Sequence, residues 1–191
     1  DTVMEMMDDE KMGKYVEQLV YEEIIPSMDY PEDMLKSFAK DVLERFRNPY
    51  IKHYLLSILL NSTSKFKARV LPSLLQYANQ KGELPTKIVL SLACLLWVYR
   101  DGVVEGNIFH SSRAKGEFDL QDDDFALDIL NGAWRTHGNN TLEFAKAALR
   151  AEKIWGMDLN EVPSLTEKVA EELKVLVQGK LADRITEVVG G

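Results

Sequence analysis

The sequence predicts an all-α fold, and three observations lead to this prediction. Apolar residues recur at steps of three and four over most of the 191 residues, which gives helices with one apolar face. Proline and glycine stand at the ends of these periodic stretches, where helices begin and end. No stretch of useful length alternates apolar and polar residues as a strand does. With 46% hydrophobic and 28% charged residues, the composition fits a single globular domain over 1–191.

Two helices are expected before residue 48. The first ends at Pro26, because proline cannot continue a helix. The second starts at Asp29 and Pro31, since proline suits the first helical turn. Asn48 followed by Pro49 then indicates the start of another helix. The apolar faces of the first two helices consist of Met12, Tyr15, Val16, Leu19, Val20 and Ile24, and of Met34, Leu35, Phe38, Ala39, Val42, Leu43 and Phe46.

The middle of the chain is expected to contain the most deeply buried helix. Pro72 should break the helix that starts at Pro49, and Gly82 should close the stretch that follows. Pro85 opens the apolar segment 88–99, which is too short to cross a bilayer. We therefore expect a central buried helix over about residues 86–100, with the single cysteine as an inert core residue. The expected core face of the helix from Pro49 consists of Tyr50, Ile51, Tyr54, Leu55, Ile58 and Leu59.

A loop and three helices are expected after residue 100. Residues 101–121 are rich in glycine and irregular in pattern, which indicates a long surface loop. Helices should follow over about 122–136, 141–155 and 163–188. Ser164 and Glu167 have the spacing of a capping box at the start of the last helix.

Composition also excludes several classes of protein. One cysteine leaves no disulfide framework, which fits a cytoplasmic chain. A net charge of −8 argues against nucleic acid as the main partner. No basic segment followed by an apolar run opens the chain, so neither a signal peptide nor a membrane partner is expected.

The net charge hides a strong division along the chain. Residues 1–44 hold 13 acids and 4 bases, residues 45–115 hold 3 acids and 11 bases, and residues 116–191 hold 15 acids and 8 bases. Between Arg45 and Gly82 there is no Asp or Glu. Two interpretations are open: these bases pair with the acidic flanks, or they face an anionic ligand such as a carboxylate or a phosphate.

Five polar residues within the basic segment are spaced four residues apart. If one helix continues through them, they form a polar stripe flanked by leucine and isoleucine, so much of that helix should be buried. Buried polar groups need partners, which are either neighbouring side chains or a ligand with hydroxyl and carboxylate groups. The five residues are His53, Ser57, Asn61, Lys65 and Arg69.

Other chemical motifs are weak or absent in the sequence. The three histidines lie far apart and have no metal-ligand spacing, so no metal is expected. Three aspartates at 122–124 suit the negative start of a helix better than a cation site. Neither glycine-rich phosphate motif occurs, and no Ser, His and Asp arrangement presents a nucleophile. The chain by itself therefore lacks a complete catalytic apparatus.

Four stretches carry a resemblance to a known family. Residues 21–26 read YEEIIP, residues 44–53 read ERFRNPYIKH, residues 61–72 read NSTSKFKARVLP, and Leu-Pro follows at 84–85. Together they resemble the C-terminal domain of the mannitol dehydrogenase family, the polyol-specific long-chain dehydrogenases. The resemblance runs from about residue 1 to about residue 181 and is strongest over 44–72.

The resemblance implies a multi-helical domain of the 6-phosphogluconate-dehydrogenase-like type. It implies an N-terminal Rossmann domain that binds NAD and a helical domain that completes the substrate cleft. It also implies a catalytic Lys, Asn and His on a helix just upstream of this chain, and no catalytic metal. The chain then looks like the C-terminal part of such an enzyme, inactive alone, with no catalytic residue of its own. Residues 101–121 form a longer segment than the family pattern has, so the resemblance predicts no role for them.

Within the family, the resemblance favours members that interconvert D-tagaturonate and D-altronate with NADH. It implies that substrate-side residues lie in this chain, with Lys65 the firmest. The other expected substrate-binding residues are Asn48, His53, Ser57, Asn61 and Arg69. A sugar acid needs a cationic partner, so the basic middle favours a uronate over neutral mannitol. Charge does not separate altronate from mannonate.

Three hypotheses therefore compete. The first is a substrate-binding domain whose partners are a sugar acid and its own Rossmann domain. The second is a helical interaction or dimerisation module, favoured by the apolar content. The third is a polyanion-binding domain that uses 45–81, which the acidic flanks disfavour.

Overall fold

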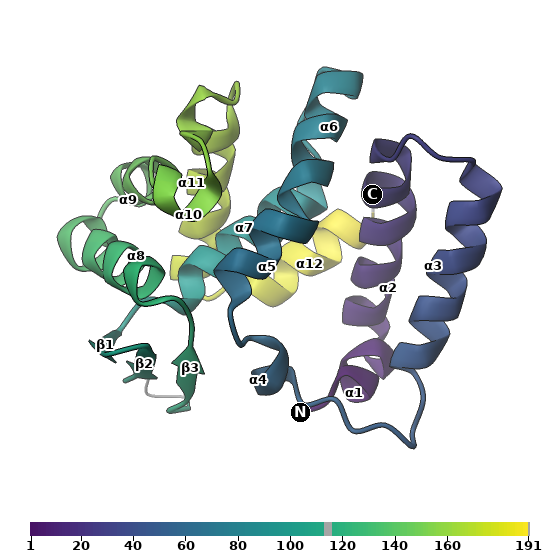
Figure 1. Cartoon of the computed structure of the whole chain (residues 1–191), viewed down its shortest axis with the longest axis horizontal. Coiled ribbons are helices and arrows are strands. Elements are labelled where there is room, and N and C mark those ends of the chain that lie inside the picture. Colours follow the sequence, from purple (N-terminus) through teal and green to yellow (C-terminus); the bar gives the residue numbers. More distant parts are fainter. Residues whose placement is uncertain (113–115, 191) are drawn as a thin grey trace.

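The computed structural model describes residues 1–112 and 116–190, and most of them are helical (Figure 1). The expectation of a helical domain is confirmed, with a small sheet added to it. Helix α7, Thr86–Val98, lies at the centre. Four of its side chains, Ile88, Leu92, Ala93 and Leu96, are fully buried. The predicted central helix over about 86–100 is therefore correct, and apolar residues on all sides explain its burial.

The N-terminal side of the molecule is a group of helices with two small apolar clusters, one of which includes Leu90 of α7. Tyr15, Leu90, Ile185 and Val189 form one cluster, and Val3, Met7 and Leu43 form the other. The buried Glu23 carboxylate accepts hydrogen bonds from the backbone N–H groups of the first turn of α7. The elements are α1 Val3–Asp8, α2 Glu10–Gln18, the π-helix η1 Leu19–Ile24, the 3-10 helix η2 Ile25–Ser27 and α3 Glu32–Phe46.

The helix expected from Pro49 is wrong for its first half. Residues 48–54 are irregular, and Asn48 accepts a hydrogen bond from the N–H of Tyr50 in a turn instead of capping a helix. Helix α4 spans only Leu55–Ile58. Helix α5, Ser62–Arg69, begins after Asn61, whose backbone is in the left-handed region. Helix α6, Leu71–Lys81, has Pro72 in its first turn and ends at Gly82, as the sequence predicts.

Residues 101–121 contain a sheet where the sequence predicted an irregular loop. The strands β1 Gly102–Glu105, β2 Ile108–Ser111 and β3 Asp119–Gln121 are antiparallel and lie in the order β1-β2-β3. Each strand has only three or four residues, which is too short for an alternating pattern to stand out. Phe109 and Leu120 are buried by the sheet's contact with the core.

The C-terminal side consists of α8 to α12, which continue the core around α7. Two expected helices are each divided in two: the first breaks at Arg150 and Ala151, and the second breaks at Gly179, which has positive φ. The predicted capping box is wrong: Ser164 is left-handed and makes no capping hydrogen bond. The elements are α8 Asp124–His137, α9 Thr141–Leu149, α10 Glu152–Trp155, the 3-10 helix η3 Leu159–Glu161, α11 Leu165–Val177 and α12 Leu181–Gly190.

Helix length and hydropathy bear on membrane association. Over residues 1–112 and 116–190, no helix combines the length and apolar character that crossing a bilayer requires.

Candidate functional site

The segment 48–61 is fixed to the first residues of the chain. The backbone N–H of Val3 donates to the carbonyl of His53 (2.8 Å), and that of Leu55 donates to the carbonyl of Asp1 (3.1 Å). Thr2 and Tyr54 form an isolated antiparallel bridge between these contacts. The N-terminus accordingly lies beside α4 (Figure 1). Backbone hydrogen bonds therefore hold this irregular segment in place without a regular helix.

The predicted polar stripe does not lie on one helix face. His53 is in the bridged segment, Ser57 is on α4, and Asn61 is in the turn that follows. Lys65 and Arg69 lie on α5. Because Asn61 has a φ of 52°, the helical path is interrupted and the four-residue spacing no longer sets the direction of the side chains. Proximity among these residues comes from the turn instead.

The turn at Asn61 brings Lys65 back onto α4. The Lys65 ammonium donates to the carbonyl of Ile58 (3.0 Å), and its backbone N–H donates to the carbonyl of Asn61 (3.1 Å). The backbone N–H of Asn61 donates to the carbonyl of Gln121 in β3 (3.0 Å). Lys65 is half-buried at this point, so its charge sits at a defined place on the surface.

A buried carboxylate holds the start of α5. Asp122 is 2% exposed and accepts hydrogen bonds from the N–H (3.1 Å) and the hydroxyl (2.8 Å) of Thr63. The phenol of Tyr99, at the end of α7, donates to the same carboxylate (2.5 Å). Burial raises the pKa of Tyr99, and the neighbouring Asp122 raises it further. The proton therefore stays on the phenol at ordinary pH.

The other predicted residues are near the turn or on its margins. Asn48 is half-buried, and its amide oxygen serves its own turn. His53, Ser57 and Arg69 have exposed side chains. The structure thus brings Asn61 and Lys65 together through a backbone hydrogen bond. Arg69 is the last residue of α5 and lies apart from them.

Pairing with the acidic flanks accounts for one base of the basic segment. Arg47 Nη2 lies 2.6 Å from Glu17 Oε1, an ion pair between the segment and α2. Within the described parts of the chain, no other base between Arg45 and Lys81 forms an ion pair. Most of the positive charge therefore stays available to an anion.

Apolar side chains around the site are exposed, contrary to the sequence prediction. The predicted core face is wrong for Tyr50, which is 94% exposed, and for Tyr54, which is 54% exposed. The loss of regular helix over 48–54 turns these side chains outward. Several exposed apolar side chains along one segment are typical of an interaction surface. We call it the apolar rim, and it consists of Tyr50, Ile51, Tyr54, Leu56, Ile58 and Leu60.

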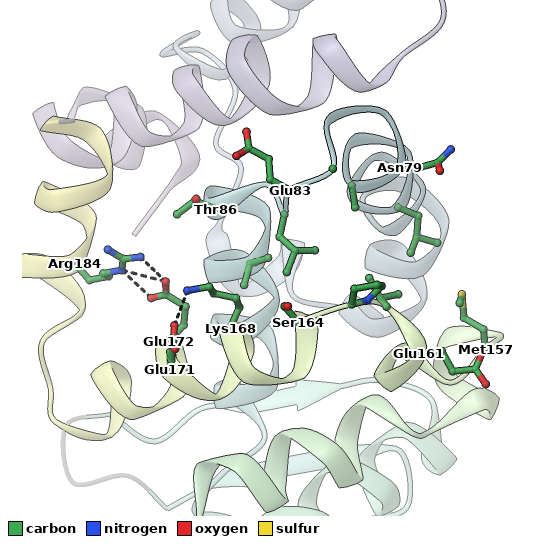
Figure 2. A pocket seen from close by; sticks show the side chains of 17 residues that line it. Asn79, Glu83, Thr86, Met157, Glu161, Ser164, Lys168, Glu171, Glu172 and Arg184 are labelled. Carbon is green, nitrogen blue, oxygen red and sulfur yellow. Dashed lines mark hydrogen bonds and ion pairs between the residues drawn. The ribbon is translucent and has the colours of Figure 1, made fainter.

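A cavity of about 830 Å³ lies elsewhere, between α6, α7, α11 and α12 (Figure 2). None of the six predicted substrate residues lines it. Its two cations are already engaged, since Arg184 binds Glu172 through two nitrogens (2.5–3.1 Å) and Lys168 binds Glu171 (2.9 Å). The cavity therefore offers no free cation to a carboxylate ligand.

Other chemistry is scarce in the described part of the chain. No group of three or more His, Cys, Asp or Glu residues could hold a metal ion there. Burial raises the pKa of the Cys94 thiol to about 12, so the thiol is protonated at neutral pH.

Sequence reasoning missed the long-range partners of the site. Asp122 was assigned to the start of a helix, and Thr63 was not singled out. Their contact joins positions 59 residues apart, and no local pattern encodes such a pair. The Gly106–Asn107 pair between β1 and β2 is the one available signal, because this pair suits a two-residue hairpin turn.

The fold defines a helical domain, and comparison with known families gives its class. Residues 1–177 match the family described as the mannitol dehydrogenase C-terminal domain, and the chain belongs to this family.

Relatives with known names refine this assignment. An altronate oxidoreductase of Pectobacterium carotovorum is 42% identical over 182 residues, which are 93% of this chain and 36% of the relative. An altronate oxidoreductase of Bacillus subtilis is 40% identical over 169 residues, which are 88% of this chain and 32% of the relative. The chain thus spans about a third of the length of these relatives.

A solved structure supports the fold. The Pseudomonas fluorescens mannitol 2-dehydrogenase, solved as a ternary complex with NAD and D-mannitol, superposes with a TM-score of 0.76 at 16% identity. The match covers 99% of this chain and 35% of that protein.

Proposed function

We propose that this chain is the substrate-side domain of an NAD-dependent oxidoreductase that interconverts D-tagaturonate and D-altronate. The observation that carries the proposal is the 42% identity to an altronate oxidoreductase over 93% of the chain. A cytoplasmic location fits a chain with a single unpaired cysteine.

Lys65 is the proposed partner of the substrate carboxylate. Its ammonium is held on the surface by one neutral carbonyl, that of Ile58. A carboxylate is a stronger acceptor than a carbonyl, so a sugar acid would replace this contact with a charge-assisted hydrogen bond. Asn61, His53 and Ser57 supply amide, imidazole and hydroxyl groups nearby in the chain for substrate hydroxyls, and Asn48 and Arg69 flank them.

The cofactor and the catalytic groups are proposed to lie in the part that the relatives have beyond this chain. The sequence holds no glycine-rich dinucleotide motif, so its residues do not fit the binding of NAD. We assign the apolar rim to contact with that part, the N-terminal Rossmann domain. The rim lies on the segment bridged to Asp1 and Val3, and the proposed Rossmann domain would precede these residues in the full-length protein.

Two alternatives differ in their ligand. A mannonate or mannitol dehydrogenase would use the same fold with another substrate. A dimerisation module would use the apolar rim to bind a second copy of this chain instead of a Rossmann domain.

The test is the substrate preference of the full-length protein. We expect NAD-dependent oxidation with kcat/KM for D-altronate above that for D-mannonate and D-mannitol. Equal or greater kcat/KM for D-mannitol would contradict a sugar-acid enzyme, and activity of residues 1–191 alone would contradict the assignment of the catalytic groups.

Lys65→Ala tests the carboxylate contact. Loss of a charge-assisted hydrogen bond costs about 1.5–3 kcal/mol, so kcat/KM for D-altronate should fall about 10- to 150-fold. Lys81→Ala is the matched control, because Lys81 belongs to the same basic segment but lies at the far end of α6. Unchanged kinetics in Lys65→Ala would remove this residue from the site.

A further inference from the structure

We propose that Asp122 is a positioning residue for the substrate carboxylate. Its buried carboxylate fixes the first turn of α5 and thereby the place of the Lys65 ammonium. This inference rests on the proposed function, because it takes Lys65 as the partner of a sugar acid.

The carboxylate of Asp122 is fully used by the protein. Oδ1 accepts from the Thr63 hydroxyl (2.8 Å) and from the N–H of Asp123 (2.9 Å). Oδ2 accepts from the N–H of Thr63 (3.1 Å) and from the phenol of Tyr99 (2.5 Å). With four donors and 2% exposure, Asp122 has no acceptor position left for substrate. Its role is therefore to hold other residues in place.

The start of α5 needs such an external partner. Helix starts leave N–H groups unsatisfied, and a side chain at the N-cap commonly accepts from one of them. Asn61 occupies the N-cap of α5, but it is left-handed and makes no capping bond with its side chain. Asp122 instead accepts from the N–H of Thr63, and so it caps α5 from a distant part of the sequence.

The sheet holds Asp122 and Asn61 in register. Asp122 directly follows β3, and its backbone N–H donates to the carbonyl of Asn107 in the turn between β1 and β2 (3.2 Å). The residue before it, Gln121, accepts from the N–H of Asn61. Gln121 and Asp122 thus hold Asn61 and Thr63 in place by hydrogen bonds. Thr63 lies two residues before Lys65 in the sequence.

Tyr99 links these hydrogen bonds to the buried core of the molecule. Its side chain is fully buried, directly after α7, and Asn131 of α8 donates to its carbonyl (3.0 Å). The contacts therefore run from the core through Tyr99, Asp122 and Thr63 to Lys65. Asn107 and Gln121, which belong to the segment predicted as a surface loop, support this path by hydrogen bonds to Asp122 and Asn61.

Asp122→Asn in the full-length protein tests the proposal. The amide replaces one acceptor oxygen by a donor, which then faces the N–H of Thr63 or the phenol of Tyr99. We expect KM for D-altronate to rise about tenfold, the effect of one disturbed polar contact, with KM for NAD unchanged. Thr63→Val should act in the same direction, and Thr63→Ser, which keeps the hydroxyl, should restore KM. Glu172→Gln, a change at another buried acid, is the control and should leave both KM values unchanged.

A double variant separates positioning from general destabilisation. If Asp122 acts through Lys65, adding Asp122→Asn to Lys65→Ala should not raise KM for D-altronate further. A further tenfold rise in that background, or equal rises of KM for D-altronate and NAD in the single variant, would overturn the inference.

Hydrogen exchange distinguishes failure of the inference from failure of the proposed function. If Lys65→Ala leaves KM for D-altronate unchanged, or no sugar acid is oxidised, the proposed function falls. In that case amide hydrogen exchange still tests whether Asp122 holds the start of α5. Asp122→Asn should raise the exchange rates over residues 62–66 and leave those of α9 unchanged. Unchanged exchange over 62–66 would overturn the positioning role itself.

Discussion

At the scale of single residues, the buried charges of this domain are held by groups from distant positions. Glu23 accepts from the N–H groups of Lys87 and Ile88, each at 2.8 Å, and caps α7 from the N-terminal side. Glu172 is held by Arg184 of α12, and hydrogen bonding to Glu172 raises the pKa of Arg184. Each of these acids joins two parts of the chain.

Glu23 gives a prediction for pH. Burial raises its pKa above the usual value, so the folded state holds its proton more tightly than the unfolded state does. Its contribution to stability is therefore fully present below the ordinary glutamate pKa of 4.5 and is lost as the pH rises through the folded-state value. Glu23→Gln lacks this dependence, so relative to the wild type it should gain stability from pH 4.5 to pH 8.

Urea unfolding of both proteins across this pH range measures the difference. The other acids are shared and cancel in the comparison. A stability difference that stays constant with pH would contradict the raised pKa of Glu23.

At the scale of elements, a glycine encodes the end of α6. Gly82 ends α6 with a φ of 71°, and the sequence predicts this end correctly. The break between α4 and α5 is different, because it depends on a left-handed asparagine held by β3. The apolar spacing over 50–59 looks helical, yet its side chains face outward, since their proposed cover lies in another part of the protein. A single sequence contains no signal for either partner.

Substitutions at two glycines test this difference. A side chain added at Gly82 meets open space, so Gly82→Ala should lose about 1–2 kcal/mol of unfolding free energy through its left-handed backbone alone. Gly132 also faces open space but lies inside α8 without positive φ, so Gly132→Ala should gain about 1 kcal/mol. Urea unfolding measures the free energy of unfolding of both variants. A loss of stability in both would show that steric crowding, and not backbone conformation, determines the effect.

At the scale of the whole molecule, one side of the domain buries its apolar side chains and another side leaves them exposed. The core around α7 contains fully buried residues from α6 to α11, as the apolar periodicity predicts. The side with the segment 48–61 exposes the apolar rim beside unpaired bases. Lys65 was predicted from its motif and charge and stays a prediction, whereas the contact between Thr63 and Asp122 is recognisable only once the sheet has folded.

The apolar rim predicts different behaviour for the domain and the full-length protein. Residues 1–191 alone should bind an apolar dye such as ANS, and Leu56→Ser with Ile58→Ser should weaken that binding, while the full-length protein binds little. Val103→Ser is the control, because Val103 is exposed on β1 away from the rim. Sedimentation of the full-length protein as a dimer that these two rim changes dissociate would favour the dimerisation module.

The bridge between the first residues and the segment 48–61 has a consequence for local opening. The amides of Val3 and Leu55 are protected only while residues 1–3 stay bridged to residues 53–55. They should therefore become accessible to solvent in one cooperative step. A fluctuation of the chain at its first three residues thus loosens His53 and Tyr54 at the same moment. The first residues and the segment 48–61 therefore form a single unit of motion.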